Sequence, residues 1–430
     1  MKSKRIAAVL VMLALCLSVW AGGQTDAGSA EGEPAKKVTL HLISHRYAAL
    51  EYYAEALQKA APPNVKVETE LMPYDQYSEK LRINLAGGSD AYDITYLDPQ
   101  NLKEFAEKGW LMPIDPFIKK YESAYDFSDI PDGIWELCRH DGVTYSVAHH
   151  QLAYILFYRG DLLSSAGISP PELLDEYVDA AVKLTTSNRY GTSLTLKAPD
   201  GLGNEFHSYL MATGGEWLDS DFRPVFNGPA GVMAIEYIKK LMKYAPPGVM
   251  NYANDESMVA MQQDKVAMMH QWSTRAAAMG NPEQSRVVGL VKWKRGVTLK
   301  PGGRPACRYT AVGYGISAFT KNDPDLIFRI IAEATGKESQ RGGAVHAMPV
   351  RLAVTAIPEL ATEHPEWAAA VDAVQSGAKE LPLISEFSKM RELSTKRIAQ
   401  ALVGELGVQE ALDTAAKEVT QLLTESGRIK

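Results

Sequence analysis

The sequence is poor in cysteine, with three in 430 residues, and it has neither a Cys-x-x-Cys pair nor a Cys/His cluster with zinc-ligand spacing. Metal binding through such motifs is therefore not expected. Long runs of lysine and arginine are also absent, and the formal net charge is −7. Because proteins bind phosphate backbones through clustered positive charge, nucleic acid is not an expected partner.

Common catalytic motifs are missing as well. The sequence has no G-x-S-x-G, no His-Glu-x-x-His and no phosphate-binding loop. His149 and His150 are adjacent, and adjacent residues of an extended segment point to opposite faces, so we do not expect them to share a metal ion. Paired carboxylates for glycoside cleavage remain open, because only the fold sets their separation. The sequence therefore predicts neither a cofactor nor a catalytic centre, and a polysaccharide-active enzyme is the less favoured alternative.

The N-terminus has the pattern of an export signal. Three basic residues precede the apolar run Ile6–Val19, which is shorter than the roughly 20 residues that cross a bilayer. Small residues near Ala21 predict a signal peptide over residues 1–21 and a periplasmic mature protein. Lipid attachment at Cys16 is the alternative, disfavoured because Leu15 is bulky where a lipoprotein motif requires a small residue.

The next segment predicts a flexible linker. Residues 22–37 are small and polar, with too little apolar surface to order themselves. The rest of the chain is long enough for two domains, and the apolar content of 46% is that of a globular protein.

Strands and helices are predicted to alternate after the linker. Periodicity predicts strands over 38–44, 65–71 and 93–97 and helices over 47–61, 75–86 and 102–109. Repeated units of this kind predict a largely parallel sheet, with ligands bound beyond the carboxyl ends of the strands. Residues 45–47, 72–74 and 96–98 would therefore line a crevice.

Further motifs recur in a fixed order along the chain. They are DITYLD at 93–98, FAEKGWLMPID at 105–115, and the segments 142–168, 214–242, 264–272, 312–320 and 348–351. Their order resembles that of the family 1 extracellular solute-binding proteins, a maltose-binding-protein-like family. Ala148 replaces a proline of the family pattern, and residues 170–175 depart from its P-x-T-W-x-E.

The resemblance implies an α/β fold of the type II periplasmic-binding-protein class. Two α/β lobes would be joined by three crossings, with a ligand cleft between them. We predict lobe 1 over 38–147 and 312–345, and lobe 2 over 148–311 and 346–430. Cys138 and Cys307 precede predicted crossings, so a disulfide is open, although two separate buried thiols are the favoured interpretation.

The resemblance also implies capture of a sugar or polyol for an ABC importer's membrane subunits by a monomeric protein. Sugars present hydroxyl edges to polar groups and C–H faces to aromatic rings. The candidate ligand-binding residues are Tyr47, Tyr96, Asp98, His149, Gln151, Trp217, Gln271, Trp272, Tyr314 and Arg351.

Trp272, at the end of an apolar strand, is the favoured candidate, followed by Asp98 and Trp217. For single tyrosines such as Tyr74 and Tyr314, a place in the core is as good an interpretation. A same-fold protein for a polyamine, a phosphodiester or an iron complex is the alternative. A polyamine would require several cleft carboxylates, and an anion would require converging arginines or helix N-termini.

Overall fold

The computed structural model describes residues 36–430, and the predicted signal peptide and most of the linker lie outside the described residues. Residues 37–430 form one compact unit. Within the described residues, no helix combines the length and apolarity that a membrane crossing requires.

A seven-stranded sheet organises this unit, in the order β2-β1-β3-β9-β6-β7 with β8 also paired to β6. The strands are β1 Val38–His45, β2 Val65–Met72, β3 Ile94–Leu97, β6 Ser146–Arg159, β7 Met268–Trp272, β8 Val291–Lys294 and β9 Tyr309–Ile316. β1 is parallel to β2 and β3, whereas the other pairs in this sheet are antiparallel. The prediction of a largely parallel sheet is therefore right only for the first three strands. It fails beyond them because β6 and β9 carry the chain in opposite directions.

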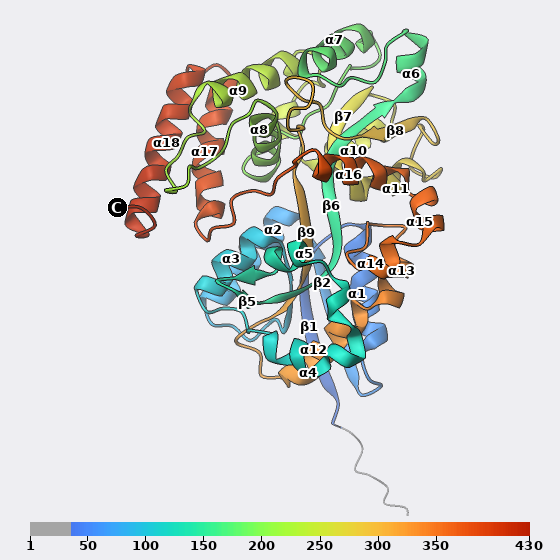
Figure 1. The fold of residues 1–430 in the computed structure, drawn as a ribbon, viewed down its shortest axis with the longest axis vertical. Helices are drawn as coiled ribbons and strands as arrows, with labels where there is room; N and C mark the ends of the chain where they lie inside the picture. Colours follow the sequence, from blue (N-terminus) through green and yellow to red (C-terminus); the bar gives the residue numbers. More distant parts are fainter. Residues whose placement is uncertain (1–35) are drawn as a thin grey trace, which may run out of the picture. The chain divides into compact units, whose positions relative to one another are not determined.

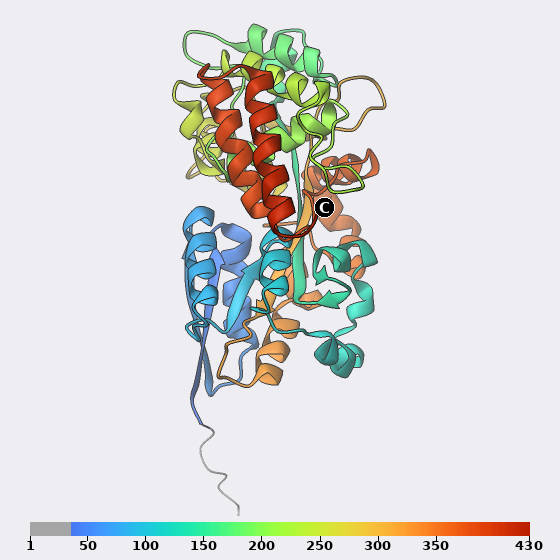
Figure 2. The same ribbon diagram turned by 90° about the vertical axis from the view of Figure 1, so that its left-hand side faces the viewer.

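Helices cover the sheet at both ends (Figure 1). Around β1 to β3 and the small hairpin of β4 Arg139–His140 and β5 Val143–Thr144 lie α1 Ala48–Ala60, α2 Tyr74–Ala86, α3 Pro99–Glu107, α4 Asp115–Tyr125, α5 Asp132–Leu137, α12 Pro324–Ala334, α13 Lys337–Gly343 and α14 Leu352–Thr355. At the other end lie α6 Gly160–Ser165, α7 Leu174–Leu184, α8 Asp200–Ala212, α9 Pro229–Met242, α10 Asn254–Gln262, the short helix η3 Ser273–Arg275, α11 Ala276–Met279, α15 Pro358–Glu363, α16 Pro365–Gln375, α17 Phe387–Leu402 and α18 Val408–Glu425. The last two helices pack side by side (Figure 2).

Local sequence explains the first elements well. The three predicted strands agree with β1 to β3 to within one residue at each end. The third helix begins at Pro99 rather than at Leu102, because Asp98 caps it: its side chain accepts a hydrogen bond from the Asn101 backbone, and proline fits the first helical position.

The buried apolar side chains form separate cores at the two ends of the sheet. We name the two halves of the protein built around these cores lobe 1 and lobe 2. The lobe 1 core surrounds β1 to β3, α1 and α12, and the lobe 2 cores surround α7 to α9, α17, α18 and β7. On β6, Val147 packs in lobe 1 and Phe157 in lobe 2, so this strand passes between the lobes. The predicted lobe boundaries stay a prediction. Val350 packs in the lobe 1 core and Ala369 in a lobe 2 core, so the chain passes between the lobes again between these two residues.

Close packing where β9 meets β6 requires glycine. A Cβ on Gly313 would lie 2.3 Å from the Val147 carbonyl oxygen, which is backbone and cannot move aside. We expect Gly313→Ala to lower the free energy of unfolding by about 1–3 kcal/mol, the usual cost of overpacking, in a urea titration. Gly133→Ala is the control, because a Cβ there meets no atom within 4 Å and should leave stability unchanged or slightly raised. A Gly313→Ala protein as stable as the wild type would contradict this packing.

Candidate functional site

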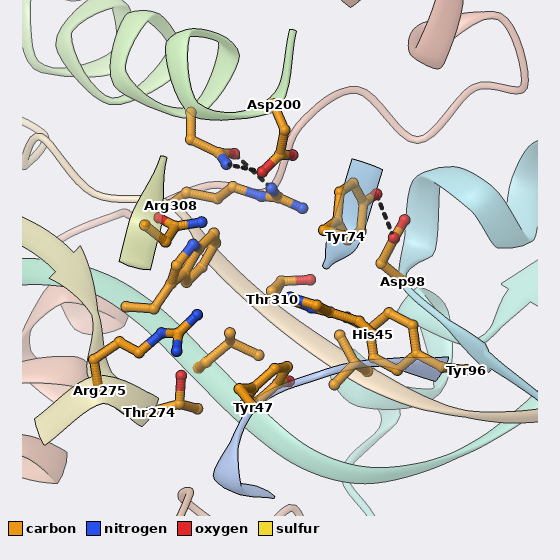
Figure 3. A pocket seen from close by; sticks show the side chains of 15 residues that line it. His45, Tyr47, Tyr74, Tyr96, Asp98, Asp200, Thr274, Arg275, Arg308 and Thr310 are labelled. Carbon is orange, nitrogen blue, oxygen red and sulfur yellow. Dashed lines mark hydrogen bonds between the residues drawn. The ribbon is translucent and has the colours of Figure 1, made fainter. Parts of the chain in front are cut away.

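A small cavity lies between the lobes, beyond the carboxyl ends of β1 and β3 (Figure 3). Its volume in this closed arrangement is about 60 Å³. It is lined by His45, Tyr47, Tyr74, Tyr96, Asp98, Leu152, Asp200, Asn204, Asn254, Trp272, Thr274, Arg275, Arg308, Thr310 and Val312. Both lobes contribute side chains, as the crevice rule for α/β sheets predicts.

Four of the ten candidate residues line this cavity: Tyr47, Tyr96, Asp98 and Trp272. Tyr47 precedes α1 and Asp98 caps α3, so both follow strands of lobe 1 directly. Trp272 ends β7, whose preceding residues pack in lobe 2, but its ring packs with the lobe 1 core. It is 8% exposed and lies edge-on against Tyr154 with ring centroids 5.3 Å apart.

Three of the other candidates lie inside the lobes. Trp217 is in the lobe 2 core, where its indole N–H donates to His207 Nδ1 at 3.1 Å. Tyr314 and His149 are buried in lobe 1, with ring centroids 4.6 Å apart. We leave these three out of the proposed site, since buried rings in contact with each other or with core groups present no face to the cavity.

The remaining three candidates bond to nearby protein groups. Arg351 donates to the carbonyl oxygens of Thr335 at 3.1 Å and Asp126 at 2.7 Å. Gln271 donates to the Asn254 carbonyl at 3.0 Å, and Gln151 donates to the Pro349 carbonyl at 2.6 Å. None of the three lines the cavity, and each donates to a backbone carbonyl instead.

His149 and His150 do not point to opposite faces, contrary to the expectation from an extended segment. The pairing of β6 with β9 shifts register between Ala148 and His150, which is a β-bulge. The bulge brings the two imidazoles together, with their Nδ1 atoms 2.7 Å apart and both rings stacked against Tyr53. No group of three or more metal-ligating side chains occurs anywhere in residues 36–430.

His45 and Tyr74 line the cavity as the crevice rule predicts for residues 45–47 and 72–74, although neither is among the ten candidate residues. Other cavity residues lie in or directly before α8, η3 and β9 and had no such signal, namely Asp200, Asn204, Thr274, Arg275, Arg308 and Thr310. The α8 residues could not be found from strand ends, because no strand of the sheet directly precedes that helix.

Charged groups at the cavity are mostly neutralised by protein partners. Arg308 donates to Glu380 at 2.5 Å, to Asn204 at 2.7 Å and to Gln100 at 2.8 Å, and it lies over the Trp272 ring. Every guanidinium nitrogen of Arg308 therefore has a partner.

The other charged groups follow the same pattern. Asp200 accepts from Arg391 at 2.8 Å, and Arg275 pairs with Asp255 at 2.9 Å. Burial and the nearby Arg275 lower the pKa of His45 to about 3, so its imidazole is neutral near pH 7. The cavity thus offers polar groups without an unpaired positive charge.

The lobes contact each other around the cavity. Arg308, directly before β9, donates a hydrogen bond to Gln100 of α3. Lys197 of lobe 2 forms an ion pair with Asp75 of lobe 1 at 3.1 Å, and Arg275 lies over the Tyr47 ring with its guanidinium carbon 5.6 Å from the centroid. These contacts define a closed arrangement of the lobes.

Two α/β lobes that close on a polar cavity, joined by three passages of the chain, define a type II periplasmic-binding-protein fold. The model of the bacterial extracellular solute-binding protein family matches residues 44–341, so the chain belongs to that family.

Comparison with known proteins supports membership of this family. The chain is 26% identical to a putative binding protein of Brucella abortus over 275 residues, and that match spans 62% of either protein. It is 20% identical over 392 residues to the mannitol-binding protein of Pseudomonas aeruginosa, covering 85% of this chain and 88% of that protein. A solved ABC transporter solute-binding protein of Agrobacterium radiobacter, in complex with ribitol, superposes with a TM-score of 0.81 at 24% identity, covering 91% of this chain and all of that one.

Proposed function

We propose that this protein captures a sugar or polyol between its lobes and delivers it to the membrane subunits of an ABC importer. The observation that carries the proposal is a cavity between closed lobes that combines aromatic rings with charge-compensated polar groups. Such a set suits a neutral solute with many hydroxyl groups.

The cavity can satisfy both surfaces of such a solute. The rings of Tyr47, Tyr96 and Trp272 can cover C–H faces. Asn254 lines the cavity, and among the described residues its buried side-chain oxygen has no hydrogen-bond partner. Since an unpaired buried acceptor is costly, this oxygen is a natural acceptor for a solute hydroxyl.

The charge pattern disfavours the alternative solutes. A polyamine would need free carboxylates, but Asp200 is paired with Arg391, and Asp98 already accepts from Tyr74 and the Asn101 backbone. A phosphodiester or other anion would need a free guanidinium, but Arg308 uses all three of its nitrogens on protein groups. The polyol names of the Pseudomonas and Agrobacterium relatives support the same class of solute.

Transport would follow from differential affinity. A solute that touches both lobes stabilises the closed form, so binding shifts the population towards a shape that membrane subunits can distinguish. No covalent step is needed, in keeping with a family of binding proteins rather than enzymes.

Export to the periplasm is part of the proposal. We expect the mature protein to be a monomer that begins near Gly22, after cleavage of residues 1–21. Intact-mass spectrometry of the exported form measures directly where the mature chain begins. A mature chain that begins with an acylated Cys16 would contradict the cleavage and indicate a lipid-anchored protein.

A thermal-shift screen tests the class of solute. We expect one or more polyols or monosaccharides to raise the unfolding temperature, because a ligand at 100 times its dissociation constant adds about 2.7 kcal/mol to the free energy of unfolding. Spermidine and glycerophosphodiesters serve as charged comparisons and should have no effect. A shift with a charged compound alone would overturn the proposed solute class.

Substitution of Trp272 tests the site. Trp272→Leu keeps an apolar side chain but removes the ring, and we expect binding to weaken by roughly 1–3 kcal/mol. Trp217→Leu is the matched control, because Trp217 lies in the lobe 2 core. It should lose about 1–3 kcal/mol of stability and keep its dissociation constant. Trp272→Leu with wild-type affinity by calorimetry would remove this ring from the site.

A further inference from the structure

A larger groove lies beside the cavity, also between the lobes. Its volume is about 860 Å³, and residues of α2 and α3 in lobe 1 and of α17 and α18 in lobe 2 form its walls. Of the described residues, only Tyr74 and Asp200 line both the groove and the cavity, so these two side chains lie at the boundary between the two spaces. Figure 3 labels both of them beside the cavity.

Two hydrogen-bonded pairs hold this boundary in place. From lobe 1, the Tyr74 hydroxyl donates to Asp98 Oδ2 at 2.7 Å, and Asp98 is fixed by the Asn101 backbone at 2.9 Å. From lobe 2, Arg391 Nη1 donates to Asp200 Oδ1 at 2.8 Å. We name Tyr74, Asp98, Asp200 and Arg391 the partition. It is complete only when the lobes are closed, because each lobe supplies one pair.

The two pairs also interact with each other across the lobes. Burial lowers the pKa of Arg391, but Asp200, Tyr74 and Asp98 together outweigh burial and raise it. The guanidinium of lobe 2 is thus stabilised in part by groups of lobe 1. Separation of the pairs would remove that stabilisation from a charge that is buried in the closed form.

We propose that the partition selects solutes by size, so that the protein takes a single sugar unit or a short polyol and rejects oligosaccharides. This rests on the proposed function and specifies its solute. A second sugar unit that extends from the cavity towards the groove would have to pass through the partition. The lobes could not then close fully, and Asp200 and Arg391 would lose their arrangement in a buried site.

The selection would act at closure rather than at entry. An open cleft admits long and short solutes alike, and only a solute that leaves the partition intact allows the closed form. A longer saccharide would therefore bind without the stabilisation that closure provides, which lowers its affinity.

Isothermal titration calorimetry with matched solutes tests this inference. The single-unit probes are D-glucose, D-mannitol and sorbitol, and the extended probes are maltose, maltotriose and maltitol. We expect the wild type to bind at least one single-unit probe and to bind the extended probes at least about tenfold more weakly.

Variants at Tyr74 distinguish the partition from the rest of the site. Tyr74→Ala removes the ring at the first residue of α2, where alanine is a good helix former. It should gain at least about tenfold in affinity for an extended probe. Tyr74→Phe keeps the ring and should still reject extended probes. The double variant Asp200→Asn/Arg391→Gln removes the ion pair without leaving one charge alone, and it should also gain affinity for extended probes.

The outcomes separate the two proposals. A wild type that binds maltotriose as tightly as its best single-unit probe overturns size selection and leaves sugar binding intact. Folded Tyr74→Ala and double variants that gain nothing for extended probes overturn it as well. A wild type that binds none of these probes counts against the proposed function, and therefore also against size selection, which depends on it.

Discussion

The contacts of Arg308 are the interaction on which the closed site depends. This guanidinium bonds to Gln100 in lobe 1 and to Asn204 and Glu380 in lobe 2, and it lies over Trp272. It is 4% exposed, so its charge must be compensated by protein groups. Closure of the lobes supplies that compensation and at the same time places rings and polar groups of both lobes around one cavity.

Charge compensation explains why the cavity suits a neutral solute. Its formal charges are placed in pairs or in hydrogen-bonded networks, which leaves few groups for a charged ligand. What remains for the solute are aromatic faces and individual acceptors such as Asn254. Protein partners therefore compensate the charges that closure buries, and the aromatic faces and individual acceptors recognise the solute.

The sequence allowed much of the fold to be predicted, because it depends on local pattern. β1 to β3 and the end of β7 follow from periodicity and the crevice rule, which place Tyr47, Tyr96, Asp98 and Trp272 at the cavity. The cap at Asp98, which starts α3 at Pro99 rather than at Leu102, did not follow from periodicity. Antiparallel pairing of β6 and β9 did not follow, since it depends on the path of the chain between the lobes.

Which other residues reach the site depends on long-range packing of the chain. Trp217 and Trp272 both end up buried, but only the second reaches the cavity. Asp200 and Arg308 reach it through contacts between residues far apart in the sequence, such as Arg308 with Gln100. A β-bulge at His149 likewise has no local signal in the sequence, yet it changes which way the neighbouring imidazoles point. Such features become visible only when the lobes are assembled.

Small-angle X-ray scattering tests the central claim, which is closure of the lobes around a solute, most directly. The radius of gyration should be compared without solute and with a saturating amount of the compound that gives the largest thermal shift. We predict a smaller radius of gyration in the bound state, because the solute favours the closed form. An unchanged scattering profile at saturation would contradict closure as the basis of binding.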